Sequence, residues 1–432
     1  MHRTMNCARK QISDLACDLR GNSSTRIVMS LAMFLLCSLF ASSQTLTTLH
    51  DFGGPGGDGA NPQAGVVFDQ AGNMYGTAAL GGKSSSDGII FQLQGGTETI
   101  LHRFGPSPAA AVPVCRLVLT GNGVLYGTTL EGGAHNMGTV FGAYPPTAPG
   151  NPWTEKILYS FGATPTDGTL PNAGVIAGRQ DHVLYGVTSA GGTNRRGTVF
   201  QLAPGAHPTD PWVETVLYNF APGGDAAFPS SELSLDQDGN LFGSTLQGGA
   251  NNVGAIYKLA RPLNPGDPWT ESVIYSFSGP DGSSPFGRLL VDVKGVIWAT
   301  TSGGGSGQAG TVYQLIPPGK PGDPWAQTVL YNFSGGQDGG SPEAGVVMDQ
   351  RGRLFGTART GGKGGPDFGG VVFVLNPPEI RGDPWRERAL VSFGGPNGFG
   401  PTSTLVLRSD GIYGTTTQGG AFGKGTVFQL TQ

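Results

Sequence analysis

The sequence predicts an all-β fold, a seven-bladed β-propeller of four-stranded blades, on three observations. Glycine and proline account for 75 and 32 of the 432 residues, yet they recur at regular positions instead of forming low-complexity tracts. Runs of about six residues rich in Val, Leu and aromatic side chains alternate with turn residues, as is typical of strands. Four motifs each occur seven times, which indicates a repeat architecture.

The four motifs mark out one repeating unit. An aromatic residue followed by small residues stands at Tyr75, Tyr126, Tyr185, Phe242, Trp298, Phe355 and Tyr413, at successive spacings of 51, 59, 57, 56, 57 and 58 residues. A glycine pair follows each of them, and then a GTVFQL-like run with its aromatic at Phe91, Phe141, Phe200, Tyr257, Tyr313, Phe373 and Phe428. The last motif is LYSF-like and ends at Phe52, Phe104, Phe161, Phe220, Phe277, Phe333 and Phe393.

Each unit has room for four short strands, and no stretch beyond the leader keeps a helical apolar period. A β-helix solenoid is the rival architecture, but its coils are usually shorter, and it needs capping segments that the sequence lacks. Within a propeller blade we expect the AGVVxD-like run innermost and the LYSF-like run outermost. The chain starts with an unmatched outer strand at residues 46–52, and its last unit, residues 402–430, lacks one. We therefore predict that the N-terminal strand completes the last blade and closes the ring.

Residues 1–43 form a predicted signal-peptide region ahead of the propeller domain at residues 44–432. The apolar run Ile27–Phe40 follows Arg20 and Arg26 and precedes small residues that suit cleavage near Ser43. A helix of this length reaches about 21 Å, which is short of the roughly 30 Å core of a bilayer. We expect export and a secreted, periplasmic or cell-surface location. A lipoprotein modified at Cys37 is the competing interpretation, which the neighbouring Leu36 disfavours.

The charge pattern excludes several classes of partner. Only 13% of residues are charged, the net charge is -4, and no Lys/Arg cluster stands out, so we expect no nucleic-acid partner and no membrane contact beyond the signal peptide. The histidines show no metal-ligand spacing, and no nucleophile elbow or phosphate-binding loop is present. We therefore predict a monomer with no catalytic residues, cofactor or metal.

The combined motif LYGTT-x-x-GG, GTVF-x-L, PW, LYSF, DG and P-x-AG-x-x-x-D-x-x-G resembles the GloVer tandem repeat of exported bacterial proteins called choice-of-anchor tandem repeat GloVer-containing proteins. The resemblance extends from about Thr45 to Gln432. It implies an exported protein, in several members with a C-terminal anchoring signal, and it implies no biochemical activity. Because only Thr431 and Gln432 follow the last strand, we expect no anchor here.

Two recurring motifs suggest ligands but have a simpler structural interpretation. Pro-Trp pairs place an indole before five outer strands, at Trp153, Trp212, Trp269, Trp325 and Trp385. They could stack on sugars, but the first unit has no Trp, so we favour packing on the blade edge. Asp-Gly pairs recur at Asp58, Asp167, Asp281 and Asp338. Each loop offers one acid where calcium needs six to eight oxygens, so we favour a turn role.

The candidate binding residues lie in the loops between each glycine pair and the next strand, where the units differ most. They are His135, Asn136, Arg195, Arg196, Asn251, Asn252, Lys363 and Asp367. Divergent loops on a rigid scaffold commonly bind ligands, although solvated tips without a ligand are the alternative.

On these grounds we expect a non-enzymatic binding or scaffold module for a glycan or a cell-surface protein. The alternative is an extracellular carbohydrate-active enzyme, a lyase or hydrolase, with acids and an Arg such as Arg195 over the central channel. Two carboxylates about 5 to 10 Å apart in one cleft would favour hydrolysis.

Overall fold

The computed structural model describes residues 44–54, 57–82, 86–148, 150–179, 183–207, 209–264, 266–320, 322–363 and 368–431. The predicted signal-peptide region, residues 1–43, lies outside these described residues, and so does Asp367. Within the described ranges, no helix is long and apolar enough to cross a membrane.

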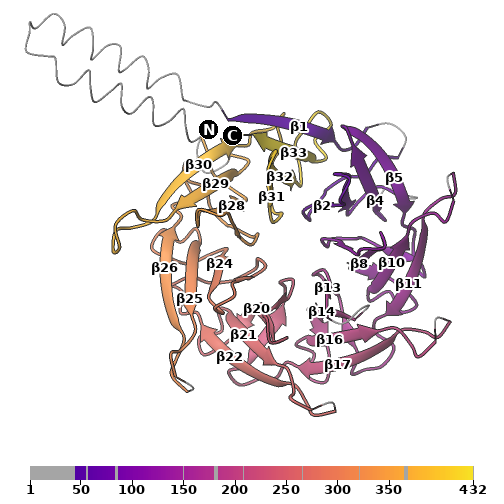
Figure 1. Cartoon of the computed structure of the whole chain (residues 1–432), viewed down its shortest axis with the longest axis horizontal. Coiled ribbons are helices and arrows are strands. Elements are labelled where there is room, and N and C mark those ends of the chain that lie inside the picture. Colours follow the sequence, from indigo (N-terminus) through magenta and orange to yellow (C-terminus); the bar gives the residue numbers. More distant parts are fainter. Residues whose placement is uncertain are drawn as a thin grey trace, which may run out of the picture. The chain divides into compact units, whose positions relative to one another are not determined.

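Seven antiparallel sheets are arranged in a ring, which confirms the predicted seven-bladed propeller (Figure 1). The innermost strands of blades 1 to 7 are β2 (Val67–Phe68), β7 (Val118–Leu119), β13 (Ile176–Ala177), β19 (Ser234–Leu235), β23 (Leu290–Val291), β27 (Val347–Met348) and β31 (Val406–Arg408). The second strands are β3 (Met74–Ala78), β8 (Leu125–Thr129), β14 (Leu184–Thr188), β20 (Leu241–Gly248), β24 (Ile297–Thr301), β28 (Leu354–Ala358) and β32 (Gly411–Thr416).

The third and outermost strands are longer than the innermost ones. The third strands are β4 (Ile89–Gln94), β10 (Thr139–Tyr144), β16 (Thr198–Ala203), β21 (Ala255–Ala260), β25 (Thr311–Ile316), β29 (Val371–Asn376) and β33 (Thr426–Thr431). The outermost strands of blades 1 to 6 are β5 (Thr97–Arg103), β11 (Thr154–Ser160), β17 (Val213–Asn219), β22 (Thr270–Ser276), β26 (Ala326–Asn332) and β30 (Arg386–Ser392). Short pairs link the loops of one face: β6 (Ala110–Ala111) with β9 (Glu131–Gly132), β12 (Gly168–Thr169) with β15 (Ala190–Gly191), and β18 (Ala226–Pro229) with β20.

The N-terminal strand closes the ring, as the sequence predicts. Strand β1 (Thr45–Asp51) is the outermost strand of blade 7 and pairs with β33, beside which it lies in Figure 1. The amide of Phe52 donates to the carbonyl of Gly425 at 3.0 Å, and the Phe that ends each other outer strand makes the same bond within its own blade. The seam therefore has the same backbone bonding as a blade built from continuous chain.

The core lies between the blades as seven apolar clusters, one at each interface. At every interface the Phe that ends one outer strand packs against the aromatic ring of the next blade's third strand, with ring centroids 5.1–5.2 Å apart. At the seam this pair is Phe52 and Phe91. The repeated aromatics of the sequence are thus the contacts that join blade to blade.

The small residues of the second strand make room for these rings. A Cβ on Gly76 would lie 2.4 Å from Cζ of Phe91, and five other blades place glycine in the same way. The Thr or Ser that follows donates its hydroxyl to a backbone carbonyl of the next blade at 2.8–3.3 Å in six of the seven interfaces. One of these bonds, from Thr415 to Ala64, crosses the seam at 3.0 Å.

The Asp-Gly motifs stabilise turns at the outer rim. Asp167 accepts hydrogen bonds from the amides of Gly162 and Ala163 at 2.8 and 3.0 Å, and from the Tyr159 hydroxyl at 3.1 Å. The tyrosine at the same position of the repeat donates to Asp281, to Asp338 and to Asp225, which alanine follows in place of glycine. The five Pro-Trp indoles are partly buried and pack on the interface clusters. Their faces are therefore largely used in packing.

Candidate functional site: the central channel

The innermost segments of the seven blades surround the central channel. Each contains the motif P-x-A-G-V-V or a variant of it, and its fourth residue is glycine in three blades, Gly65, Gly174 and Gly345. In the other four blades the same position is occupied by Arg116, Glu232, Arg288 and Thr404. These side chains line the channel. The repeat therefore gives the channel three small positions and three charged ones.

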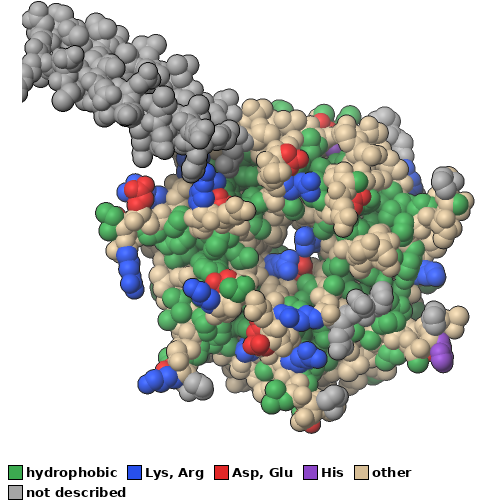
Figure 2. Space-filling model, viewed as in Figure 1, with side chains coloured by type: hydrophobic (Ala, Val, Ile, Leu, Met, Phe, Trp, Pro, Cys, Tyr) green, Lys and Arg blue, Asp and Glu red, His purple; other side chains and the backbone are tan. Residues whose placement is uncertain are grey.

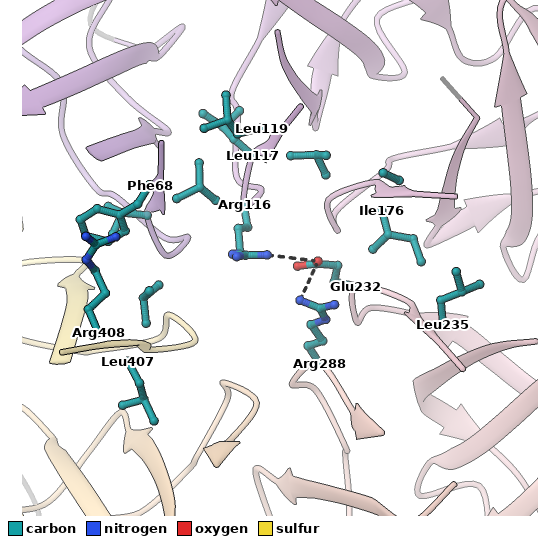
Figure 3. Close-up of a pocket in the computed structure, with 15 residues that line it drawn as sticks. Phe68, Arg116, Leu117, Leu119, Ile176, Glu232, Leu235, Arg288, Leu407 and Arg408 are labelled. Carbon is teal, nitrogen blue, oxygen red and sulfur yellow. Dashed lines mark ion pairs between the residues drawn. The ribbon is translucent and has the colours of Figure 1, made fainter. Parts of the chain in front are cut away.

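The three charged residues meet across the channel. Arg116 extends from blade 2, Glu232 from blade 4 and Arg288 from blade 5, and both arginines point toward the one carboxylate (Figure 3). Oε1 of Glu232 lies 3.7 Å from Nη1 of Arg116 and 3.4 Å from Nη1 of Arg288. Both distances exceed the 2.7–2.9 Å of a tight charge-assisted hydrogen bond. The two guanidinium groups therefore share one carboxylate loosely and keep N–H donors for another anion.

Partial burial strengthens the electrostatic interactions among these three charged side chains. The Glu232 side chain is 13% exposed, and those of Arg116 and Arg288 are 32% and 38% exposed. Burial lowers the pKa of Arg116, Glu232 opposes that shift, and the like charge of Arg288 adds to it. Two cations and one anion at this depth leave an excess positive charge that an anionic ligand would neutralise.

A third arginine, Arg408, lines the channel beside this group. The guanidinium carbon of Arg408 lies 4.3 Å from the centroid of the Phe68 ring, and its Nε lies 3.5 Å from Oδ1 of Asp410. Arg408 stands where the corresponding segments of four blades carry aspartate, as at Asp69. Stacking on an aromatic face holds a guanidinium group in place while leaving its edge available.

The cavity that these residues line has a volume of about 530 Å³, within the range of small-molecule sites. Three arginines and a single acid supply its charged groups, and Val, Leu, Ile and Phe side chains supply its apolar wall. Figure 2 shows Lys and Arg side chains gathered around the central opening of the face that it draws. The cavity therefore suits a ligand with an anionic group and an apolar or ring-shaped body.

The channel continues past the charged group toward the face that carries the Asp-Gly loops. A middle section of about 100 Å³ is lined by both Glu232 and Glu343, and a wider mouth of about 380 Å³ is lined by Glu343 and Arg359 among others. Nη1 of Arg359 donates to Oε1 of Glu343 at 2.9 Å. The middle section has room for a few water molecules, at about 30 Å³ each, and divides the two wider cavities.

The loop residues predicted from sequence lie elsewhere. His135 with Asn136, Arg195 with Arg196, and Asn251 with Asn252 are neighbours within loops of blades 2, 3 and 4, and Lys363 belongs to blade 6. None of these lines the cavities described above. The structure thus spreads the described members of this set over four separate loops.

Several of these loop residues have a structural task. The side-chain oxygens of Asn136 and Asn252 accept hydrogen bonds from the amides of Gly132 and Gly248 at 3.0 Å. Both residues have positive φ, 54° and 56°, and Arg195 at the equivalent position has φ 58°. Asparagine favours this left-handed conformation. The side chains of Asn136 and Asn252 therefore stabilise their own loops.

The remaining loop residues have varied surroundings. The Asn251 amide donates to the carbonyl of Phe277 at 2.9 Å. The Arg196 guanidinium carbon lies 6.0 Å from the Phe228 ring centroid. His135 and Lys363 have exposed side chains, and Asp367 lies outside the described residues.

The residues predicted from the sequence did not include Arg116, Glu232, Arg288 or Arg408. A signal for them was present, since each replaces a residue that recurs at the same position of other repeats. Arg116 and Arg288 sit in segments whose other residues are largely apolar, where an isolated charge faces either a partner or a cavity.

A model of the Gloeobacter/Verrucomicrobia repeat matches residues 35–200, 151–265 and 263–432. The chain belongs to the Gloeobacter/Verrucomicrobia repeat family. This confirms the GloVer resemblance noted from the sequence motifs. No curated protein matches the chain.

Solved structures similar to this member of the repeat family have low sequence identity. A candidate oxidoreductase (glucose dehydrogenase) from Thermus thermophilus is 17% identical, with 90% of this chain and 99% of that chain covered and a TM-score of 0.42. A candidate 6-phosphogluconolactonase from Bacteroides uniformis is 14% identical, with 77% and 85% covered and a TM-score of 0.48. A protein of unknown function from Dyadobacter fermentans is 10% identical, with 90% and 98% covered and a TM-score of 0.47. At these identities the likeness bears on neither ligand nor chemistry.

Proposed function

We propose that the protein is an exported, non-enzymatic binding module that takes an anionic ligand, such as an acidic glycan or an acidic segment of a cell-surface protein, into its central channel. The observation that supports this most strongly is the Arg116–Glu232–Arg288 group in a cavity of about 530 Å³. Guanidinium groups recognise carboxylate, sulfate and phosphate groups through paired N–H donors. Export is supported by the apolar run Ile27–Phe40 behind its basic residues.

The charge distribution favours selective binding in the channel over general adhesion to polyanions. The whole chain has a net charge of -4, so its outer surface should repel acidic polymers weakly. The lining of the channel cavity has three arginines against one acid. An anion is therefore attracted into the channel specifically, and its apolar part can contact the surrounding Val and Leu side chains.

A binding screen with matched variants tests the proposal. The full chain is applied to an array of neutral and acidic glycans, and bound ligands are then measured with Arg116→Gly. Three blades carry glycine at this position, so the variant should keep the fold, and Arg288 remains to pair with Glu232. We expect a loss of affinity of about 10-fold or more, as for a charged hydrogen bond. Arg196→Ala in an outer loop is the control and should bind as the unchanged chain does.

Binding of acidic ligands that is equal in Arg116→Gly and in the unchanged chain would exclude the channel as their site. An array with no acidic glycan bound would leave acidic protein segments as the ligand class, which synthetic Asp/Glu peptides test in the same format. Failure of both classes would overturn the proposal.

A hydrolase is the second candidate, because Glu232 and Glu343 both line the middle section of the channel. Two carboxylates are the usual requirement for glycoside hydrolysis. Each of these carboxylates is paired with arginine, and the section they share is about 100 Å³. Release of reducing sugar from any glycan on the array, abolished in Glu232→Gln, would favour this candidate.

A further inference from the structure

Three metal-ligating side chains meet at the seam where the ring closes. His50 belongs to β1 of blade 7, Asp58 to the loop that follows it, and Glu98 to β5 of blade 1. Nε2 of His50 lies 3.4 Å from Oδ2 of Asp58 and 3.8 Å from Oε1 of Glu98, and the ligand atoms of all three lie within 4.8 Å of one another. Their side chains are 16%, 8% and 14% exposed.

No short hydrogen bond joins His50 to either carboxylate. The two separations from Nε2 of His50 are longer than the 2.7–2.9 Å of a charged N–H···O bond. Nε2 of His50 and Oε1 of Glu98 are both inaccessible to water and make no hydrogen bond with the described residues. Buried polar atoms without a partner are costly. The matching oxygens of Glu214, Glu271 and Glu387 also lack a partner, so the atom particular to the seam is Nε2 of His50, and a group that binds it would stabilise the seam.

We propose that His50, Asp58 and Glu98 form a binding site for a divalent transition-metal ion, Zn²⁺ or an ion of similar size such as Mn²⁺. Bonds of about 2.0–2.2 Å to a tetrahedral ion place the ligand atoms about 3.4 Å apart. One separation from Nε2 of His50, 3.4 Å, equals this spacing, the other, 3.8 Å, is slightly longer, and all three ligand atoms lie within 4.8 Å of one another. Three protein ligands leave one position for water or an exogenous ligand.

The surroundings hold the carboxylates in place and give the site a need for positive charge. The amides of Gly53 and Gly54 donate to Oδ2 of Asp58 at 3.0 and 3.1 Å, and such outer bonds orient metal ligands. Two largely buried carboxylates face one imidazole here, with their ligand atoms within 4.8 Å of one another. A bound dication would satisfy both carboxylates at once.

The other interfaces show why one site is expected per chain. At the position of His50, four outer strands carry tyrosine, whose hydroxyl donates to the local Asp. Blade 1 has His102 at this position with Glu155 beyond it, but the loop that follows, residues 105–109, contains no Asp. Only the seam combines histidine with both acids among the described residues. The metal would join the N-terminal strand to blade 1.

Matched variants at this one position test the site with the full chain. His50→Tyr restores the residue of four other interfaces, so it should fold while lacking the nitrogen ligand. His102→Ala removes the histidine of the next interface. Tyr218→His should create a second histidine and two-carboxylate set with Asp225 and Glu271. Zn²⁺ binding is measured by calorimetry and thermal unfolding, and Mn²⁺ is the second probe, because the thiols of Cys7, Cys17 and Cys37 in residues 1–43 are poor ligands for it.

We expect one equivalent of Mn²⁺ for the unchanged chain and for His102→Ala, none for His50→Tyr and two for Tyr218→His. Zn²⁺ should raise the unfolding temperature by several degrees in the unchanged chain and not in His50→Tyr, since a ligand of the folded state stabilises it. Equal binding of both ions by the unchanged chain and a folded His50→Tyr variant would overturn the site. So would the absence of saturable binding of either ion at millimolar concentration, in which case the cluster is an imidazolium ion pair.

Discussion

Replacing Glu271 by glutamine should stabilise the protein above pH 7 and have a much smaller effect near pH 5. Glu271 on β22 faces Asp225, the rim aspartate that accepts a hydrogen bond from Tyr218 at 2.9 Å. Its Oε1 is inaccessible and has no hydrogen-bond partner in the described structure. Burial, and then the negative charge of Asp225, raise the pKa of Glu271 to about 7. Glu214 and Glu387 occupy the same position in other blades, with the same direction of shift.

The sign follows from proton binding. Between the unfolded pKa of 4.5 and the folded pKa of about 7, the folded carboxyl holds a proton that the unfolded chain has released. The stability contributed by the neutral carboxyl is therefore complete below pH 4.5 and is lost as the pH rises through about 7. The shift of about 2.5 pKa units sets an upper limit of about 3.4 kcal/mol. Because the side chain is partly exposed, solvent screening reduces this, and we expect about 1–2 kcal/mol.

Urea unfolding followed by tryptophan fluorescence measures the effect at about pH 5 and about pH 8.5. The amide cannot ionise, so the stability of Glu271→Gln should exceed that of the unchanged chain by about 1–2 kcal/mol at the higher pH and by about a quarter of that near pH 5. Glutamine fits this position, since Gln327 of the next interface occupies it and its amide donates to the Asp281 carbonyl at 3.3 Å. Glu379→Gln in an exposed loop is the control. A difference that is the same at both pH values would refute the reasoning.

Three further substitutions test how the blades are joined, each by urea unfolding near neutral pH. Phe52→Ala should cost about 3–5 kcal/mol, because it empties the seam's buried ring position; a cost below about 1 kcal/mol would mean that β1 does not hold the ring closed. Gly76→Ala should cost about 1–3 kcal/mol, because its Cβ would lie 2.4 Å from the Phe91 ring; no loss would show that the ring shifts freely. Thr415→Val should cost about 1–3 kcal/mol through the unpaired Ala64 carbonyl; an unchanged midpoint would contradict a role for this bond.

The architecture could be predicted from sequence because it depends on features that repeat. The seven terminal Phe residues and seven strand-three aromatics form the seven blade contacts, so their count is the blade count. Closure of the ring by the N-terminal strand could be predicted from the number of strands in each unit, because residues 46–52 precede the first complete blade and the last unit lacks an outer strand. A fold stabilised by identical contacts is visible in one sequence, because each repeat is evidence for the next.

The channel group could not be predicted in the same way. Arg116, Glu232 and Arg288 lie far apart in sequence, and their meeting depends on the radius of the ring and on which blades face each other. The sequence alone gives neither the radius of the ring nor the blades that face each other across the channel. Asn136 and Asn252 were predicted to bind a ligand because they are variable polar residues in loops. Their side chains fold back onto glycine amides, a role that depends on the backbone conformation of the loop.

The seven repeats of the chain can be compared with one another position by position. Both proposed sites lie at positions where one repeat carries a different residue from most of the others. Arg116 stands where three blades have glycine, and His50 stands where four have tyrosine. The residues that agree among repeats are used up in packing, turns and interblade hydrogen bonds, so they leave few groups for a ligand. Placing a charge or an imidazole in a partly buried position costs folding free energy, and the repeats without these residues show that the fold does not need them. Reverting these residues to the repeat should therefore keep the propeller while weakening anion binding in Arg116→Gly and removing metal binding in His50→Tyr, which separates the function of this chain from its architecture.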